Sequence, residues 1–130
     1  GFRQGDRAIL IFSELLQKRY PKNSFIAHIG GDDFFVGLTD FTFEDVFELT
    51  LDIQNEFKYS AKNLYSNEDK ELGYIVSKDR FGTTRNFNLL SVSCAIVEIN
   101  CKSNILNFDD TLNSMKKESK SSKEPVYKVL

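Results

Sequence analysis

The chain has 130 residues and a net charge of −2, and 41% of its residues are hydrophobic. This length suits one domain, the hydrophobic fraction predicts a packed core, and the slightly acidic balance argues against a general nucleic-acid-binding protein. No apolar stretch approaches the roughly 20 residues of a membrane span, and two cysteines are compatible with a reducing compartment. We therefore expect a soluble, cytoplasmic domain that makes no membrane contact of its own.

The first predicted element is a helix from Asp6 to Tyr20. Its apolar residues recur at helical spacing, Gly5 and Asp6 mark its start, and Pro21 follows its end. An aspartate at this position is typical of a helix N-terminus, where negative charge is favourable.

A β-hairpin follows, because residues 29–35 read I-G-G-D-D-F-F between two apolar runs. Gly30 and Gly31 supply the positive φ of a tight turn without steric cost. The tip would present Asp32 and Asp33 with almost no side-chain bulk around them. An anionic ligand and a cation can then approach the backbone closely, which chemistry on nucleotide phosphates requires.

The middle of the chain predicts a helix, a loop and strands. Thr42-x-x-Asp45 resembles a capping box and opens an amphipathic helix. Residues 59–72 are polar without a clear period, so we expect a loop with a frayed helical start. Strands are predicted at 73–77 and 86–90 around a turn, the second continuing through 91–99 as a central strand covered on both sides.

The last predicted elements are a helix over 107–119 and a short strand over 126–130. The element order predicts one sheet with helices, in an α+β or α/β sandwich.

Four segments in this order resemble the GGDEF domain, the family of bacterial diguanylate cyclases and their inactive relatives. They are G-F-R-Q-G-D at 1–6, G-G-D-D-F at 30–34, S-V-S-C-A-I at 91–96, and Asp109-x-x-Leu112 followed by Lys116 and Lys120. The similarity runs from the first residue nearly to the last, so residues 1–130 are interpreted as a single GGDEF-like domain. The resemblance implies an α+β fold with a palm-like, antiparallel-rich sheet and flanking helices, related to nucleotidyl cyclases and polymerases.

The reaction implied by the resemblance is condensation of two GTP molecules into cyclic di-GMP with release of pyrophosphate. Each subunit of that family holds one GTP, so a homodimer is required for catalysis. The resemblance makes Asp32 and Asp33 the catalytic residues and the ligands of Mg²⁺ or Mn²⁺, which neutralises phosphate charge and favours ionisation of the attacking 3′-hydroxyl. Asp33 stands where the family usually has Glu. Because the aspartate side chain is one methylene shorter, its carboxylate reaches about 1.5 Å less far. The alternative for Asp32 is a turn aspartate that binds its own backbone.

The resemblance also implies substrate-binding residues. Asp6 matches a residue that contacts guanine, although it could equally cap the first helix. Gly30 and Gly31 would keep the tip open for phosphate. Lys116 and Lys120, spaced i and i+4, match positions that contact the triphosphate; the alternative is a solvated lysine face.

Two departures from the family concern other positions. His28 stands where the family commonly has Arg; a largely neutral histidine cannot replace that cation, and we expect a packed strand residue without a catalytic role. Pro21 and Ser24 occupy the places of the R-x-x-D product-inhibition site, so feedback binding of cyclic di-GMP there is not expected.

The family's first strand, with a further metal-binding Asp, would precede Gly1. We therefore expect an N-terminally incomplete fragment that does not cyclise GTP by itself. Residues 59–87 form a family-variable insertion with a hairpin, similar to GGDEF domains that share a polypeptide with an EAL phosphodiesterase domain. Two functions stay open: a diguanylate cyclase in the complete parent protein, or a catalytically inactive regulatory module that controls an attached domain such as an EAL phosphodiesterase. An EAL or a sensor domain is the partner expected in the same polypeptide.

Overall fold

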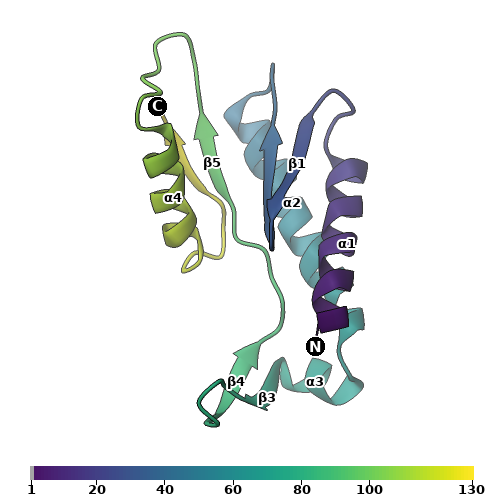
Figure 1. Cartoon of the computed structure of the whole chain (residues 1–130). Coiled ribbons are helices and arrows are strands. Elements are labelled where there is room, and N and C mark those ends of the chain that lie inside the picture. Colours follow the sequence, from purple (N-terminus) through teal and green to yellow (C-terminus); the bar gives the residue numbers. More distant parts are fainter. Residues whose placement is uncertain (1) are drawn as a thin grey trace.

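The structure, a computed structural model, describes residues 2–130, and for residues 2–4 it describes only the backbone. Its elements are those of an α+β protein, as predicted (Figure 1). In chain order they are α1 (Phe2–Arg19), β1 (Phe25–Gly30), β2 (Asp33–Gly37), α2 (Phe43–Ala61), the 3-10 helix η1 (Lys62–Leu64), α3 (Asn67–Leu72), β3 (Tyr74–Lys78), β4 (Thr84–Asn88), β5 (Ala95–Glu98), α4 (Phe108–Ser119) and β6 (Val126–Val129).

The main core lies between α1 and α2. Both helices carry apolar residues three or four positions apart, so each has one apolar stripe, and the stripes face each other. Tyr20 at the end of α1 is buried with them, and its hydroxyl bonds the Thr50 hydroxyl on α2 at 3.0 Å. Burial raises the pKa of Tyr20 to about 12, and this hydrogen bond lowers the same pKa by a smaller amount. The buried residues of this core are Ala8, Leu15, Leu16, Tyr20, Ile53, Phe57 and Ala61.

The β1–β2 hairpin covers this helix pair. Ile26 on β1 pairs with Val36 on β2, and both side chains pack against the core together with Phe34. The two apolar runs that predicted the hairpin are thus its strands, and the faces alternate as the pleat requires.

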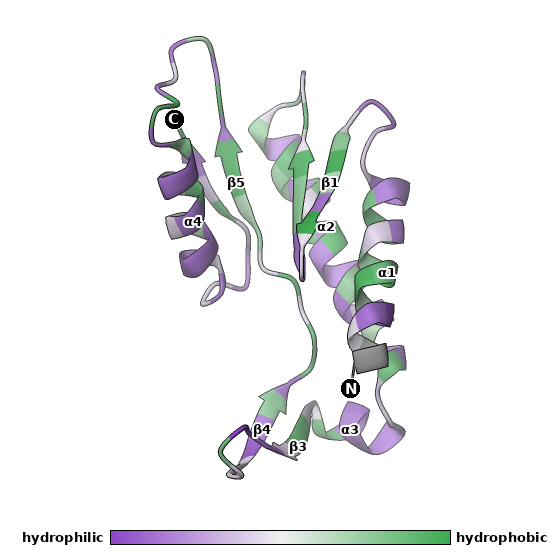
Figure 2. Cartoon of the chain, in the orientation of Figure 1, coloured by the Kyte–Doolittle hydropathy of each residue, from purple (hydrophilic) through white to green (hydrophobic). Residues whose placement is uncertain are grey.

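A second, smaller packing unit combines α4 with the parallel pair β5–β6. Met115 on α4 is buried, and Phe43 at the start of α2 stacks on Tyr127 of β6 with ring centroids 3.7 Å apart. Tyr127 donates its hydroxyl proton to Glu98 on β5, and this bond raises the pKa of Tyr127 to about 12. Figure 2 shows apolar strands beside a mostly polar outer surface of α4.

The prediction of one continuous sheet is not met by the described residues. β1–β2 and β3–β4 are antiparallel pairs, β5–β6 is a parallel pair, and no hydrogen-bonded ladder joins one pair to another in residues 2–130. β2 and β5 stand next to each other in Figure 1, but each pairs on one side only within this range.

The predicted central strand also differs, because β4 ends at Asn88 and β5 begins at Ala95. Between them the Val92 carbonyl accepts a hydrogen bond from the Gln54 side chain on α2, at 2.8 Å. This tertiary contact takes the place of a ladder bond, and β5 is half-buried along its length.

Two helical predictions need correction. α1 begins at Phe2, so Asp6 lies within the helix and the cap interpretation is wrong; a single Gly5 inside a helix costs only about 1 kcal/mol. Gly1, the first residue of the G-F-R-Q-G-D segment, lies outside the described residues. The predicted loop over 59–72 contains the end of α2, η1 and α3, which is capped by Ser66 and ends at Gly73 with φ 78°. α3 has only six residues, too few to show a period.

The remaining predicted elements are confirmed within one or two residues. Thr42 Oγ1 accepts from the Asp45 amide at 3.2 Å and caps α2. Within residues 2–130, no helix combines the length and the apolar character that crossing a bilayer demands.

Candidate functional site

The tip of the β1–β2 hairpin is an exposed turn built on two glycines. Gly30 has φ 144° and Gly31 has φ 54°, values that side chains rarely adopt. A Cβ added at either position would meet nothing within 4 Å. The backbone conformation therefore requires glycine here, and the space around the tip is open to a ligand.

Lys116 on α4 reaches the tip from 83 residues further along the chain. Its Nζ lies 2.9 Å from Asp33 Oδ2, at the first residue of β2. The two side chains are 42% and 49% exposed, so this ion pair contributes only about 0–1 kcal/mol to stability. The ion pair is informative because it brings together two residues that the resemblance assigned to one site.

Asp32 is exposed in the turn beside Asp33. Within residues 2–130, the Asp32 carboxylate accepts no hydrogen bond from its own turn, so the alternative of a backbone-binding aspartate receives no support. Both carboxylates of the predicted pair thus lie at the solvent-facing end of the hairpin.

The donor set of the tip fits a magnesium ion only in part. Magnesium prefers oxygen ligands and commonly takes one or two carboxylates together with waters and substrate phosphates. Asp32 and Asp33 supply two carboxylates, and the described residues contain no group of three or more His, Cys, Asp or Glu side chains placed to hold a metal. The two carboxylates supply part of the coordination that magnesium prefers, so its remaining ligands would have to come from outside the protein.

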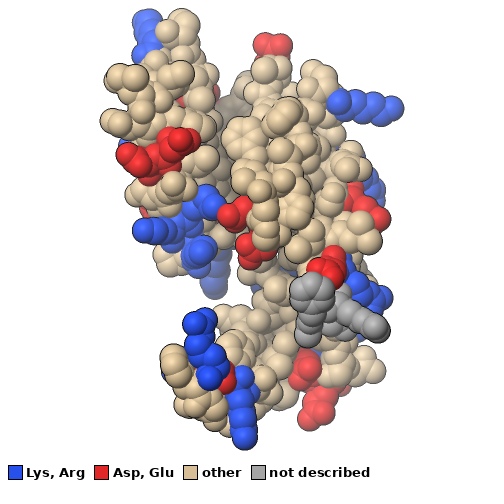
Figure 3. Space-filling view, viewed as in Figure 1, with Lys and Arg blue, Asp and Glu red and all other residues tan. Residues whose placement is uncertain are grey.

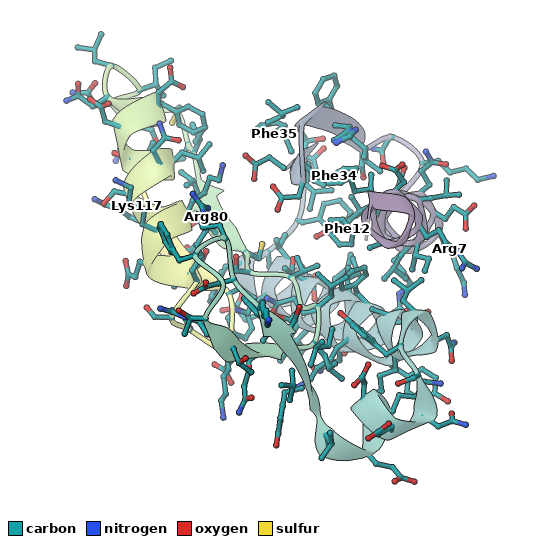
Figure 4. All side chains as sticks on the ribbon, turned by 60° about the horizontal axis from the view of Figure 1, so that its bottom comes forward. Arg7, Phe12, Phe34, Phe35, Arg80 and Lys117 are labelled. Atoms are coloured by element: carbon teal, nitrogen blue, oxygen red, sulfur yellow. The ribbon has the colours of Figure 1, made fainter. Side chains whose placement is uncertain are left out.

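His28 supports the turn, a role that the sequence did not predict. Its Nε2 donates to the Gly31 carbonyl at 2.8 Å, and its ring stacks on Phe34 at 4.5 Å with an interplanar angle of 12°. Phe34 in turn meets Phe12 of α1 edge-on, with ring centroids 5.0 Å apart. Figure 4 shows the two side chains lying toward each other. The prediction that His28 is a packed strand residue is therefore wrong in part: His28 lies in β1 but is exposed, and its ring contacts the core through Phe34. Its only sequence signal is a polar ring two positions before the glycines.

This bond fixes one peptide plane of the turn. In a trans peptide the carbonyl and the next amide proton point in opposite directions. With the Gly31 carbonyl held by His28, the N–H of the same peptide, that of Asp32, points away from the His28 ring.

The other predicted site residues are not joined to the tip. Lys120 is exposed at the C-cap of α4, one turn beyond Lys116. Asp6 is exposed on α1, which flanks the hairpin on the side away from α4 (Figure 1). Within the described part of the chain, neither residue makes a hydrogen bond or ion pair with Asp32 or Asp33.

Figure 3 shows how charge is distributed on this face. Basic side chains gather at the lower end of α4, acidic ones lie beside them at the hairpin tip, and more basic side chains lie below on the β3–β4 hairpin. Neighbouring cations and carboxylates suit a ligand that is itself an anion carrying a cation.

The chain was compared with protein-family models, curated proteins and solved structures, and none of these comparisons found a match. Support for a function therefore comes from the residues and their geometry.

Proposed function

We propose that the chain is a GGDEF-type cyclic di-GMP signalling domain, with a palm-like fold, that condenses two GTP molecules into cyclic di-GMP in its complete parent protein. The supporting observation is the 2.9 Å contact between Lys116 and Asp33 at a glycine turn. The resemblance assigned these residues to the triphosphate and to the metal from two separate segments. The fold then places them in contact across 83 residues.

Each residue of the tip has a role in this proposal. Lys116 exchanges Asp33 for a phosphate oxygen when the nucleotide binds, which leaves the Asp33 carboxylate available beside that of Asp32. A magnesium or manganese ion bound there supplies charge neutralisation and favours ionisation of the 3′-hydroxyl. Gly30 and Gly31 allow the phosphates to approach, the Asp32 N–H donates to them, and Lys120 adds positive charge.

Specific observations favour a second candidate, a catalytically inactive module that binds nucleotide and controls an attached domain such as an EAL phosphodiesterase. Asp33 is shorter than the glutamate usual in the family and is already paired with Lys116. His28 serves the turn and stands where the family commonly has Arg. In this case Mg²⁺–GTP binds without turnover.

Calorimetric titration of Mg²⁺–GTP into the chain tests the shared part of both candidates. We expect binding that is lost in Asp32→Asn/Asp33→Asn and weakened about tenfold in Lys116→Ala, the loss of one charge-assisted bond. Lys117→Ala is the matched control, because Lys117 is the next residue of the same helix; it should bind like the wild type. Absence of GTP binding by the wild-type chain would contradict the proposal.

Turnover separates the two candidates. The parent protein at its full natural length is incubated with Mg²⁺–GTP, and the products are identified by mass spectrometry. Cyclic di-GMP supports the cyclase, and saturable GTP binding without product supports the regulatory module.

A further inference from the structure

Residues 67–88, which comprise α3, β3 and β4, form an arm that is set apart from the rest of the chain at the bottom of Figure 1. β3 and β4 pair with each other, and in the described residues no third strand joins them. Every residue of β4 is exposed. An isolated two-stranded hairpin is marginally stable in water, and its outer edges offer unpaired backbone groups. The arm therefore has the properties of a segment that gains from a partner.

The tip of the arm is rigidly built. The Asp79 carboxylate accepts from the amides of Phe81 at 2.9 Å and Thr83 at 3.0 Å, and it pairs with Arg85 Nε at 2.7 Å. Gly82, with φ 80°, donates its amide proton to the Asp79 carbonyl at 3.0 Å. A preorganised tip loses little conformational entropy on docking.

Charge is separated along the arm. The tip carries Lys78, Arg80 and Arg85 against one carboxylate, Asp79. Because Arg85 and Asp79 pair with each other, the positive excess of the tip comes from Lys78 and Arg80. The base, α3, carries the opposite excess, with carboxylates at Glu68, Asp69 and Glu71 against Lys70. In Figure 3 the basic side chains of this lower part lie on the left and the acidic ones on the right.

Apolar side chains are exposed along the arm, from its base to its tip. Leu72 at the base is 48% exposed, Val76 on β3 is 53% exposed and Phe81 at the tip is 83% exposed. Arg80, Phe81 and Phe87 line a shallow, open depression at the tip. Single exposed apolar residues are ordinary, but a series along one protruding element is typical of an interface.

We propose that two copies of the chain dimerise through their arms, laid antiparallel about a two-fold axis, so that the basic tip of each contacts the acidic α3 of the other. The charges select this occupant, because the complement of each end of the arm is the other end of the same arm. Two-fold pairing satisfies both ends at once and leaves no open contact that would extend into a fibre. A surface of 22 residues at most is near the lower limit of a standard interface, so the dimer is weak and reversible. The proposal does not depend on nucleotide binding.

Sedimentation equilibrium of the whole chain over a range of concentrations tests the proposal through charge reversal. We expect a monomer–dimer equilibrium that shifts to monomer as salt is raised. The tip variant Lys78→Glu/Arg80→Glu and the base variant Glu68→Lys/Glu71→Lys should each weaken dimerisation at least tenfold. An equimolar mixture of the two variants should restore it, because each arm then meets a complementary partner. Lys22→Glu/Lys102→Glu reverses two exposed cations elsewhere and should leave the dimer unchanged.

An apolar variant gives a second, independent readout. Phe81→Ser should weaken the dimer, whereas Leu106→Ser, at a residue 87% exposed outside the arm, should not. Circular dichroism of every variant confirms that the fold is retained. A wild-type chain that stays monomeric at all concentrations overturns the proposal. The proposal is also overturned if both charge-reversal variants dimerise as strongly as the wild type, or if the mixture of the two variants stays monomeric.

Discussion

The chain contains two antiparallel hairpins, each with glycine and aspartate at its turn, and they use these residues in opposite ways. In β3–β4, Asp79 turns its carboxylate inward and binds the amides of Phe81 and Thr83. In β1–β2, Asp33 turns outward to Lys116, and the turn is instead held by His28. An aspartate engaged by its own turn is structural, whereas one held by a distant cation is available to a ligand. This difference identifies the β1–β2 tip as the candidate site.

The largest expected difference between the hairpins concerns packing. Phe34→Ala removes a ring that contacts both His28 and Phe12 and should lower the free energy of unfolding by about 2 kcal/mol, less than for a fully buried phenylalanine. Phe87→Ala in exposed β4 should cost less than about 1 kcal/mol. Urea denaturation measures both. Equal losses would show that β3–β4 is packed in solution as firmly as β1–β2.

The second largest expected difference is between Asp79 and Asp33, in what each carboxylate contributes to stability. Asp79→Ala leaves two turn amides and Arg85 without their acceptor, so local stability at the arm tip should fall by about 1–2 kcal/mol. Asp33→Ala should change global stability by about 1 kcal/mol at most. Hydrogen exchange of the Phe81 and Thr83 amides should accelerate about tenfold or more in the first variant and stay unchanged in the second. Unchanged exchange in Asp79→Ala would remove the structural role of that carboxylate.

A smaller effect is expected at the turn glycine of the candidate site. Gly31→Ala should cost about 1 kcal/mol, because alanine is strained at φ 54°, although its Cβ meets no neighbour. Gly31→Asn should cost less, since asparagine tolerates this conformation better. Thermal unfolding of both variants checks the order. A neutral Gly31→Ala would mean that the turn adopts another backbone conformation.

High pH should destabilise the part of the protein outside the arm that contains Tyr20, Cys94 and Tyr127. The pKa values of Tyr20 and Tyr127 are raised to about 12, and burial raises the pKa of Cys94 to about 11. A raised pKa favours the neutral form in the folded state, so stability is full below pH 9 and falls as the pH rises toward 12. Urea denaturation from pH 7 to pH 11 should show this fall, with a smaller fall in Cys94→Ala. Near neutral pH the effect vanishes.

The sequence predicted the elements that depend on local rules. The β1–β2 hairpin follows from a glycine turn between apolar runs, the β3–β4 hairpin from a turn between two strand-like segments, and the start of α2 from Thr42. Residues 89–94 could not be predicted, because the Gln54–Val92 contact that breaks the strand joins positions 38 residues apart. The Asp33–Lys116 pair came only from the resemblance, since nothing local connects the two residues. The role of His28 depends on ring stacking, which no sequence pattern displays.

The measurement that tests the central claim most directly compares the two turns in one experiment. Mg²⁺–GTP is titrated into isotopically labelled chain, and the backbone amide resonances of both hairpin tips are followed by NMR. We predict saturable shifts at Gly30, Gly31 and Asp32, while the amides of residues 79–82 stay in place. Unmoved amides at the glycine turn, or equal shifts at both tips, would contradict a nucleotide site at the β1–β2 hairpin.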